Sequence, residues 1–153
     1  KIANYIGKPV YLSLNQLLMI SNLLDNLNWL AALAGGAAYY VIGAAWYGIL
    51  GKGWMEAAGL TAEQIKTNFN KAVYGLTFVV EIIIVAFMGG FMSAETSLSD
   101  AAQLGLVVGL IFSGLTTYVH YLYTMRKPNL IFYDAGYTTI ASIVAAVVYA
   151  AIN

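Results

Sequence analysis

Apolar residues along this chain fall into four long stretches, which polar segments separate. The stretches cover approximately residues 28–50, 72–92, 101–124 and 131–152, and each contains 21 to 24 residues. A helix needs about 20 residues, at a rise of ~1.5 Å per residue, to cross the ~30 Å hydrocarbon core of a membrane. Soluble helices are rarely apolar on all sides over such a length. The pattern therefore predicts an all-α integral membrane bundle of four transmembrane helices, which form one domain over residues 28–153.

A shorter apolar segment lies in the N-terminal extension, residues 1–27. The segment covers residues 10–24, about 15 residues, and polar side chains interrupt it, so it is short for a membrane span. We expect an extra N-terminal interfacial helix, or a helix packed on the bundle. A secretory signal peptide fits poorly, because no small-residue cleavage pattern follows. Met19 is an alternative initiator, so it stays open whether residues 1–18 belong to the mature protein.

Composition supports a membrane protein. Hydrophobic residues make up 61% of the chain and charged residues 9%, whereas soluble domains have roughly 25% charged residues. Seven Lys and Arg balance seven Asp and Glu, so no basic surface is expected to attract nucleic acid. The chain has no cysteine and one histidine, which argues against a zinc or haem site built from protein ligands. We therefore expect no metal site.

The loops differ in charge, and this difference predicts orientation. Three lysines lie in the loop 51–71, and Arg126 and Lys127 lie in the loop 125–130, whereas the loop 93–100 carries only acids. Cation-rich loops of membrane proteins face the cytoplasm. The loops 51–71 and 125–130 are therefore expected on the cytoplasmic side.

The loop 51–71 also contains a helix-start signal. Thr61 and Gln64 have the spacing of a capping box, in which each side chain bonds to the backbone of the other residue. A helix is expected to start near Ala62, and its continuation into the second span is left open.

Small residues recur four positions apart, which is how helices approach closely within a membrane. In the third span these residues are Gly105, Gly109, Ser113 and Thr117, and in the fourth they include Ser142 and Ala146. We expect packing within the bundle. The alternative is an interface with a second copy or with other membrane subunits; the remaining partners are membrane lipids.

Glu81 lies near the middle of the second stretch. A charge at the bilayer centre costs about 2.5–3.5 kcal/mol on insertion scales, so Glu81 should face the bundle interior and be protonated or paired. Counting residues from the ends of each span gives the depth of each side chain in the membrane. The depths predict a midplane polar cluster of Glu81 with Tyr39 or Tyr40, and with Ser113 or Ser142. The alternatives are a neutral Glu that fixes helix register, a site that handles protons or cations, and a contact to a partner subunit or lipid headgroup.

His120 and Asp134 form a second candidate pair. They lie on helices joined by a short turn, at similar expected depth near the cytoplasmic side. Such a pair can relay protons. The alternative is a structural pair, His120 with Asp134 or Arg126 with Asp134, that holds the hairpin together.

Catalytic signatures are missing from the sequence. There is no GxSxG, HExxH, P-loop or Gly-rich dinucleotide motif. We expect no enzymatic activity and assign no catalytic residues. Apolar faces rich in Tyr and Trp suit a pigment or quinone as well as ordinary lipid, so no cofactor is assigned.

Two segments resemble a known family. The first runs from Gly43-Ala44-Ala45-Trp46-Tyr47 into Gly51-Lys52-Gly53-Trp54, and the second is Leu130-Ile131-Phe132-Tyr133-Asp134-Ala135-Gly136-Tyr137. Over residues 28–152 the chain resembles a bacterial family catalogued as domain of unknown function 1761. The resemblance implies a small four-span protein of the bacterial cytoplasmic (inner) membrane. Its family-typical positions would be Trp46, Tyr47, Lys52, Trp54, Asp134 and Tyr137.

Two functions are compatible with these observations. Short loops and helix-packing residues favour a non-enzymatic structural or accessory subunit of a membrane assembly, either a homo-oligomer or part of a larger complex. The alternative is a small proton-coupled transporter or channel that uses Glu81 at the membrane midplane.

Overall fold

The computed structural model describes residues 27–153, and this part of the chain forms helices and no strands. In chain order the helices are α2 (Trp29–Ala58), α3 (Ala62–Asn68), α4 (Ala72–Gly89), α5 (Leu98–Leu106), the π-helix η1 (Val107–Gly114), α6 (Leu115–Tyr123) and α7 (Leu130–Ile152). The segments α5, η1 and α6 follow one another without a break. The helix expected over residues 10–24 lies outside the described residues.

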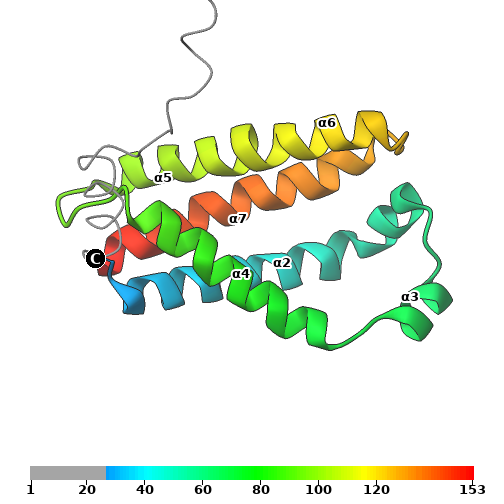
Figure 1. Cartoon of the computed structure of the whole chain (residues 1–153), viewed down its shortest axis with the longest axis horizontal. Helices are drawn as coiled ribbons and strands as arrows, with labels where there is room; N and C mark the ends of the chain where they lie inside the picture. The colour runs from blue at the N-terminus through cyan, green and yellow to red at the C-terminus, as the bar shows by residue number, and fades with distance from the viewer. Residues whose placement is uncertain (1–26) are drawn as a thin grey trace, which may run out of the picture.

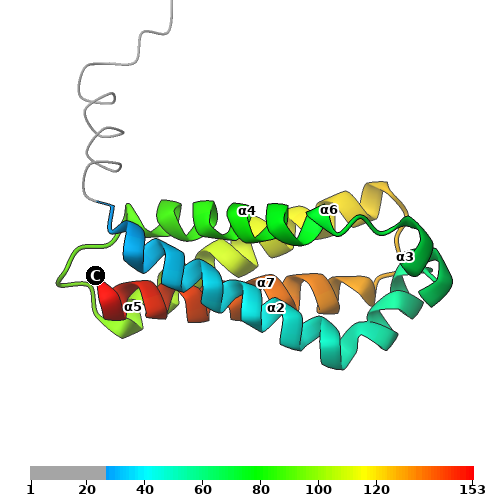
Figure 2. The same cartoon turned by 90° about the horizontal axis from the view of Figure 1, so that it is seen from below.

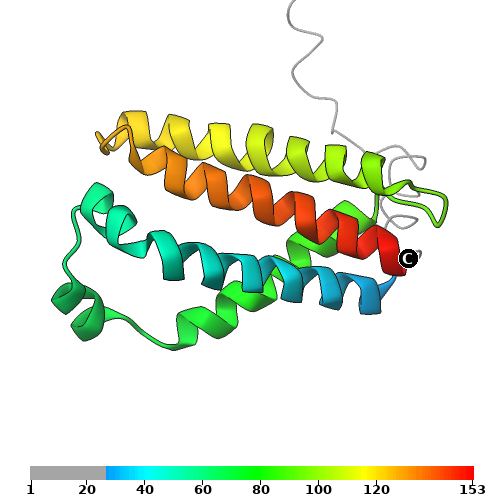
Figure 3. The ribbon, with the colours of Figure 1, turned by 180° about the vertical axis from the view of Figure 1, so that it is seen from behind.

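Four helices are long and apolar enough to cross a membrane. They are α2 with 30 residues, α4 with 18, the continuous α5–α6 segment with 26, and α7 with 23. They correspond one by one to the four predicted spans, so the predicted all-α membrane bundle is confirmed. In Figures 1 and 3, α7 lies between α5–α6 on one side and α2 on the other, and α4 crosses α2.

Helix α2 is longer than predicted. The first span was expected to end at residue 50, but the helix continues to Ala58, where Gly59 takes a left-handed conformation with φ 73°. The extra turns contain Trp54, whose indole N–H donates a hydrogen bond to Asp134 of α7 at 3.1 Å. Tertiary contacts of this kind stabilise the extra turns of the helix, which the apolar pattern of the sequence does not predict.

The predicted capping box is present. Gln64 N donates to the Thr61 hydroxyl at 3.1 Å, and Thr61 N donates to Gln64 Oε1 at 2.8 Å. Helix α3 therefore begins at Ala62, as expected. It does not continue into the second span, because Phe69 has an extended backbone with φ −77° and ψ 120°.

Close approach of backbones at glycines holds α2, α4 and α7 together. A Cβ atom added at Gly36 would lie 3.0 Å from the Cα of Ile82, so α2 and α4 touch at this crossing. Beyond the crossing, the two helices diverge toward the end that carries α3 (Figure 2). Residues 72–77 of α4 are exposed as a result.

Gly105 and Gly109 pack against α7. A Cβ added at Gly105 would lie 2.5 Å from the Ser142 carbonyl oxygen, and one at Gly109 would lie 2.6 Å from the Thr138 carbonyl oxygen. Across the interface, Ser142 and Ala146 are buried. These positions therefore serve packing within the chain.

The small residues predicted four positions apart in the third span do not all face α7. An α-helix would place Ser113 and Thr117 above Gly109, but residues 107–114 form a π-helix, whose hydrogen bonds span five residues instead of four. The wider turn brings Gly114 into the buried position, next to Ala135. Ser113 and Thr117 are only half-buried.

These glycine contacts generate the first prediction. Gly105→Ala should lower the free energy of unfolding by about 1–3 kcal/mol, because its methyl group overlaps the α7 backbone. Thermal unfolding of the purified protein in detergent, followed by circular dichroism, measures the change.

Gly75→Ala is the matched control, since a Cβ there would meet nothing within 4 Å. It should leave stability unchanged or raise it by up to ~1 kcal/mol through helix propensity. Equal unfolding temperatures for the two variants would contradict the packing described for Gly105.

Candidate functional site

Glu81 belongs to the buried face of α4. This face consists of Glu81, Val85, Ala86, Met88 and Gly89, spaced at helical intervals. The Glu81 side chain is 4% exposed. The carboxylate is therefore turned into the bundle and lies next to Ile82, at the crossing of α4 and α2.

Tyr137 is the direct partner of Glu81. Its hydroxyl donates a hydrogen bond to Glu81 Oε1 at 2.6 Å. The other oxygen, Oε2, is buried and has no hydrogen-bond partner among residues 27–153. Gly43 of α2 makes room for this contact, because a Cβ there would lie 2.9 Å from the Tyr137 hydroxyl.

Tyr39 and Ser142 form the next layer. Ser142 Oγ donates to the Tyr39 hydroxyl at 3.3 Å, and that hydroxyl donates to the Thr138 carbonyl at 3.5 Å. The Tyr39 and Tyr137 rings meet edge to face, with centroids 5.6 Å apart. Glu81, Tyr137, Tyr39 and Ser142 thus form a continuous group, in which Tyr137 stands between Glu81 and the predicted hydroxyls.

The other two candidates for the predicted midplane cluster, Tyr40 and Ser113, make no hydrogen bond to this group. The ring of Tyr40 packs against Phe78, with centroids 5.6 Å apart. Ser113 has no hydrogen bond to the group, because the π-helix turns it away from the position that an α-helix would give it. Tyr137 was missed as the Glu81 partner, although the family resemblance marked it.

Asp134 has a full set of donors. Tyr47 donates to Oδ1 at 2.8 Å, Trp54 donates to the same oxygen at 3.1 Å, and Tyr121 donates to Oδ2. The donors come from α2 and α6, so Asp134 of α7 ties three helices together. Both of its oxygens are satisfied by neutral side chains.

His120 is not part of this arrangement. It is exposed, and the structure gives it no hydrogen bond or ion pair with Asp134 within residues 27–153. The predicted His120–Asp134 pair is therefore not formed, nor is the alternative Arg126–Asp134 pair. Neutral donors take the place of both cations: Tyr47 and Trp54 of α2, the latter on the turns beyond the predicted span, and Tyr121 of α6.

Two aromatic rings connect the acids. Tyr47, which bonds Asp134, packs against Tyr137, which bonds Glu81; their centroids are 5.4 Å apart. Tyr47 also packs against Trp54 at 5.6 Å. The two carboxylates thus belong to one aromatic group, centred between α2 and α7.

A pocket of about 580 Å³ lies between α2 and α4, and we call it the α2–α4 pocket. Its lining residues are Tyr40, Gly43, Ala44, Tyr47, Gly48, Trp54, Phe69, Val73, Tyr74, Thr77, Glu81 and Tyr137. Val73, Tyr74 and Thr77 are exposed, whereas Glu81 is buried. The pocket therefore extends from the exposed turns of α4 inward to the carboxylate.

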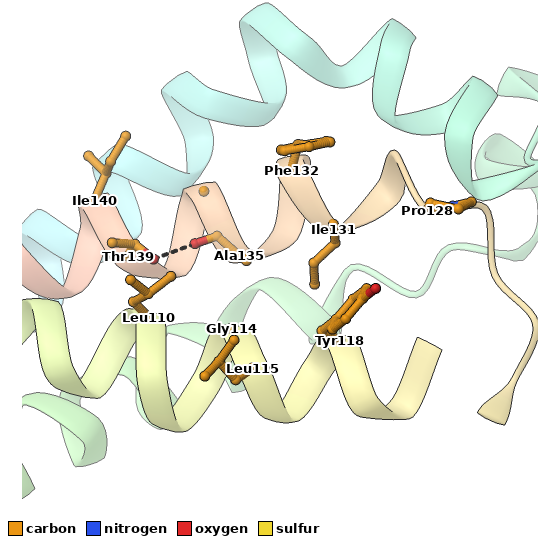
Figure 4. Close-up of a pocket in the computed structure, with 11 residues that line it drawn as sticks. Leu110, Gly114, Leu115, Tyr118, Pro128, Ile131, Phe132, Ala135, Thr139 and Ile140 are labelled. Atoms are coloured by element: carbon orange, nitrogen blue, oxygen red, sulfur yellow. Dashed lines mark hydrogen bonds between the residues drawn. The ribbon is translucent and has the colours of Figure 1, made fainter. Parts of the chain in front are cut away.

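A second pocket, of about 650 Å³, lies between α6 and α7 (Figure 4). Apolar side chains such as Leu110, Ile131 and Phe132 line it. The hydroxyl of Thr139 donates to the Ala135 carbonyl at 2.6 Å, so its proton is not free for a ligand. This surface is of the kind that lipid chains cover.

Metal ligands are not grouped in the described part of the chain. Within residues 27–153 there is no group of three or more His, Cys, Asp or Glu side chains that could hold a metal ion. The chemistry available to the site is that of two carboxylates with tyrosine and tryptophan donors.

The donors around Asp134 generate the second prediction. Asp134→Ala should lower the free energy of unfolding by at least about 2 kcal/mol, because it leaves three donors without an acceptor. Asp134→Asn should have a smaller effect, since an amide oxygen still accepts from Tyr47 and Trp54. Thermal unfolding in detergent measures both.

His120→Ala serves as the control, because His120 is exposed. Its unfolding temperature should match that of the wild type. If His120→Ala were as destabilising as Asp134→Ala, a His120–Asp134 pair would have to form after all.

Comparison with known proteins places the chain in a family. A family model described as "Protein of unknown function (DUF1761)" matches residues 30–150, which include all four membrane-type helices almost completely. No curated protein and no solved structure matches significantly. The match covers Glu81, Asp134 and Tyr137 together with the α2–α4 pocket. The chain therefore belongs to the DUF1761 family of proteins of unknown function.

Proposed function

We propose that this protein is a small proton-coupled membrane transporter in which Glu81 carries the proton. One observation carries the proposal: Glu81 is buried at the middle of α4, has one oxygen without a partner, and lines a pocket. Ionisable residues inside a membrane are expensive, and they commonly mark substrate and proton pathways.

Comparison of the two acids supports this role. Asp134 receives donors on both oxygens and ties three helices together, as a structural acid does. Glu81 has one donor. Buried polar atoms are normally satisfied, so an orphan such as Oε2 needs a reason beyond packing.

Tyr137 suits both protonation states of Glu81. A tyrosine hydroxyl donates to a carboxylate, and it accepts from a carboxylic acid after rotation of its O–H bond. The 2.6 Å contact can thus persist when Glu81 gains or loses its proton. A Lys or Arg in the same place would hold Glu81 ionised and block the exchange.

Charge distribution suggests the side to which the pocket leads. Figure 1 puts α3, the C-terminal end of α2, the start of α4 and the turn between α6 and α7 at one end of the bundle. These segments contain Lys52, Lys66, Lys71, Arg126 and Lys127. The connection between α4 and α5 at the other end holds no Lys or Arg. By the positive-inside rule we assign the α3 end to the cytoplasmic side of a bacterial inner membrane.

We also infer that the protein is not an enzyme, since transport requires no bond cleavage and the sequence has no catalytic motif.

The second candidate function is an accessory subunit. One observation favours it: residues 72–77 of α4 are exposed, with Leu76 65% exposed. Gentle extraction and native mass spectrometry would then give a complex with other subunits at fixed ratio.

Proton exchange at Glu81 is the third prediction. In lipid bilayers, infrared difference spectra recorded between about pH 5 and pH 9 should show a carboxyl band that appears as the pH falls. The reason is that Glu81 has a neutral partner and, in the part of the chain that the structure describes, no cation bonded to it. Glu81→Gln should abolish this band.

Glu95→Gln is the matched control, because Glu95 is an exposed acid in the connection between α4 and α5. It should leave the Glu81 band in place. A Glu81 carboxyl whose band does not change over the whole range would be a structural acid, and this result would overturn the proposal.

A further inference from the structure

We infer that the α2–α4 pocket binds an organic cation, an amine or quaternary ion with apolar substituents. The inference rests on the proposed function in that both use Glu81, and it adds the chemical class of the substrate. Four features of the described residues carry it: the charge of the lining, its aromatic walls, the position of Glu81, and the open space at Gly48.

Charge selects the sign of the ligand. Among the twelve lining residues, Glu81 is the one acid, and none is Lys, Arg or His. From the neighbouring helices, the titratable groups near Glu81 are Tyr39, Tyr40 and Tyr47 of α2 and Tyr137 of α7. An anion would find no counter-charge in this pocket, whereas a cation would find Glu81.

Aromatic side chains make up half of the lining. They are Tyr40, Tyr47, Trp54, Phe69, Tyr74 and Tyr137. The faces of aromatic rings attract cations, and cages of such rings bind quaternary ammonium groups. Rings also provide apolar contact area for the substituents, so the walls suit a cation with an apolar body better than a metal ion.

The carboxylate is placed to meet such a ligand. Glu81 lines the pocket, and its Oε2 is still without a partner. The last torsion of a Glu side chain is broad, so rotation about it can turn Oε2 toward a ligand. A volume of about 580 Å³ lies within the range of ~300–1,000 Å³ typical of small-molecule sites.

The pocket between α6 and α7 makes a useful contrast. It is slightly larger, but no charged residue is among its described lining residues, and its Thr139 hydroxyl is already bonded. Shape alone therefore does not distinguish the α2–α4 pocket. The combination of an aromatic lining with an incompletely bonded acid does.

Glycines in α2 allow the pocket to be filled without touching Glu81. Gly48 lines the pocket, and a Cβ there would meet nothing within 4 Å. Gly48→Leu should therefore occupy ligand space and leave the fold intact. Gly51 is equally open but does not line the pocket, so Gly51→Leu is the matched control.

The fourth prediction uses tetraphenylphosphonium as the probe. Equilibrium dialysis with the full chain in detergent should show saturable binding to the wild type. Binding should weaken at least tenfold in Glu81→Gln, through loss of the counter-charge, and at least tenfold in Gly48→Leu. Gly51→Leu and Glu95→Gln should bind like the wild type. Tetraphenylborate, an anion of similar shape, should not bind saturably.

Each outcome decides one point. Equal binding of the cation to the wild type and to Glu81→Gln, or equal saturable binding of tetraphenylborate, would overturn the inferred ligand class. Saturable binding that Gly48→Leu leaves unchanged would place the ligand outside this pocket and also overturn it.

The infrared titration separates this inference from the proposed function. A Glu81 that exchanges its proton but binds no tetraphenylphosphonium would leave the transporter proposal standing and overturn the ligand class. Cation binding that depends on Glu81, with no proton exchange at Glu81, would support the binding site and contradict proton coupling.

Discussion

The crossing of α2 and α4 determines most of what is distinctive in this protein. At Gly36 the backbone of α2 comes so close to Ile82 that no side chain fits between them. Two helices that touch at one point and diverge beyond it must leave a wedge on the open side. Glu81 lies next to the contact, where the bundle buries it, and the wedge is the α2–α4 pocket. Burial of the acid and access to it are thus consequences of the same crossing.

Within hydrocarbon, polar groups must find their partners in the protein. The bundle meets this requirement for Asp134 with Tyr47, Trp54 and Tyr121, and in doing so it fixes α2 and α6 against α7. Glu81 is treated differently, although it is buried more deeply in the same aromatic group. The difference makes Asp134 a structural acid, whereas Glu81 keeps one oxygen without a partner among the described residues, which is the basis of the proposed function.

Much of the architecture follows from the sequence alone. The length of the apolar stretches predicts the four helices. The energetic cost of a charge in a membrane predicts that Glu81 faces the bundle interior. The partner of Glu81 could not be predicted in this way, because counting residues gives depth but not the rotation or tilt of neighbouring helices. Depth pointed to Tyr39 or Tyr40 and to Ser113 or Ser142, whereas helix rotation brings Tyr137 to the acid, between it and Tyr39. The π-helix was not predicted either, because the sequence pattern assumes α-helical spacing. Its wider turn moves Ser113 out of line with Gly105 and Gly109.

The tyrosines also explain why two acids can share one aromatic group. Tyr47 and Tyr137 are in contact, and their hydroxyls donate to opposite acids, so neutral dipoles separate the carboxylates. Because Asp134 is satisfied in this way, it needs no cation. In the described part of the chain no Lys, Arg or His forms an ion pair with either acid. Under the proposed function, Glu81 is therefore neutralised by its own proton or by a positively charged ligand in the pocket.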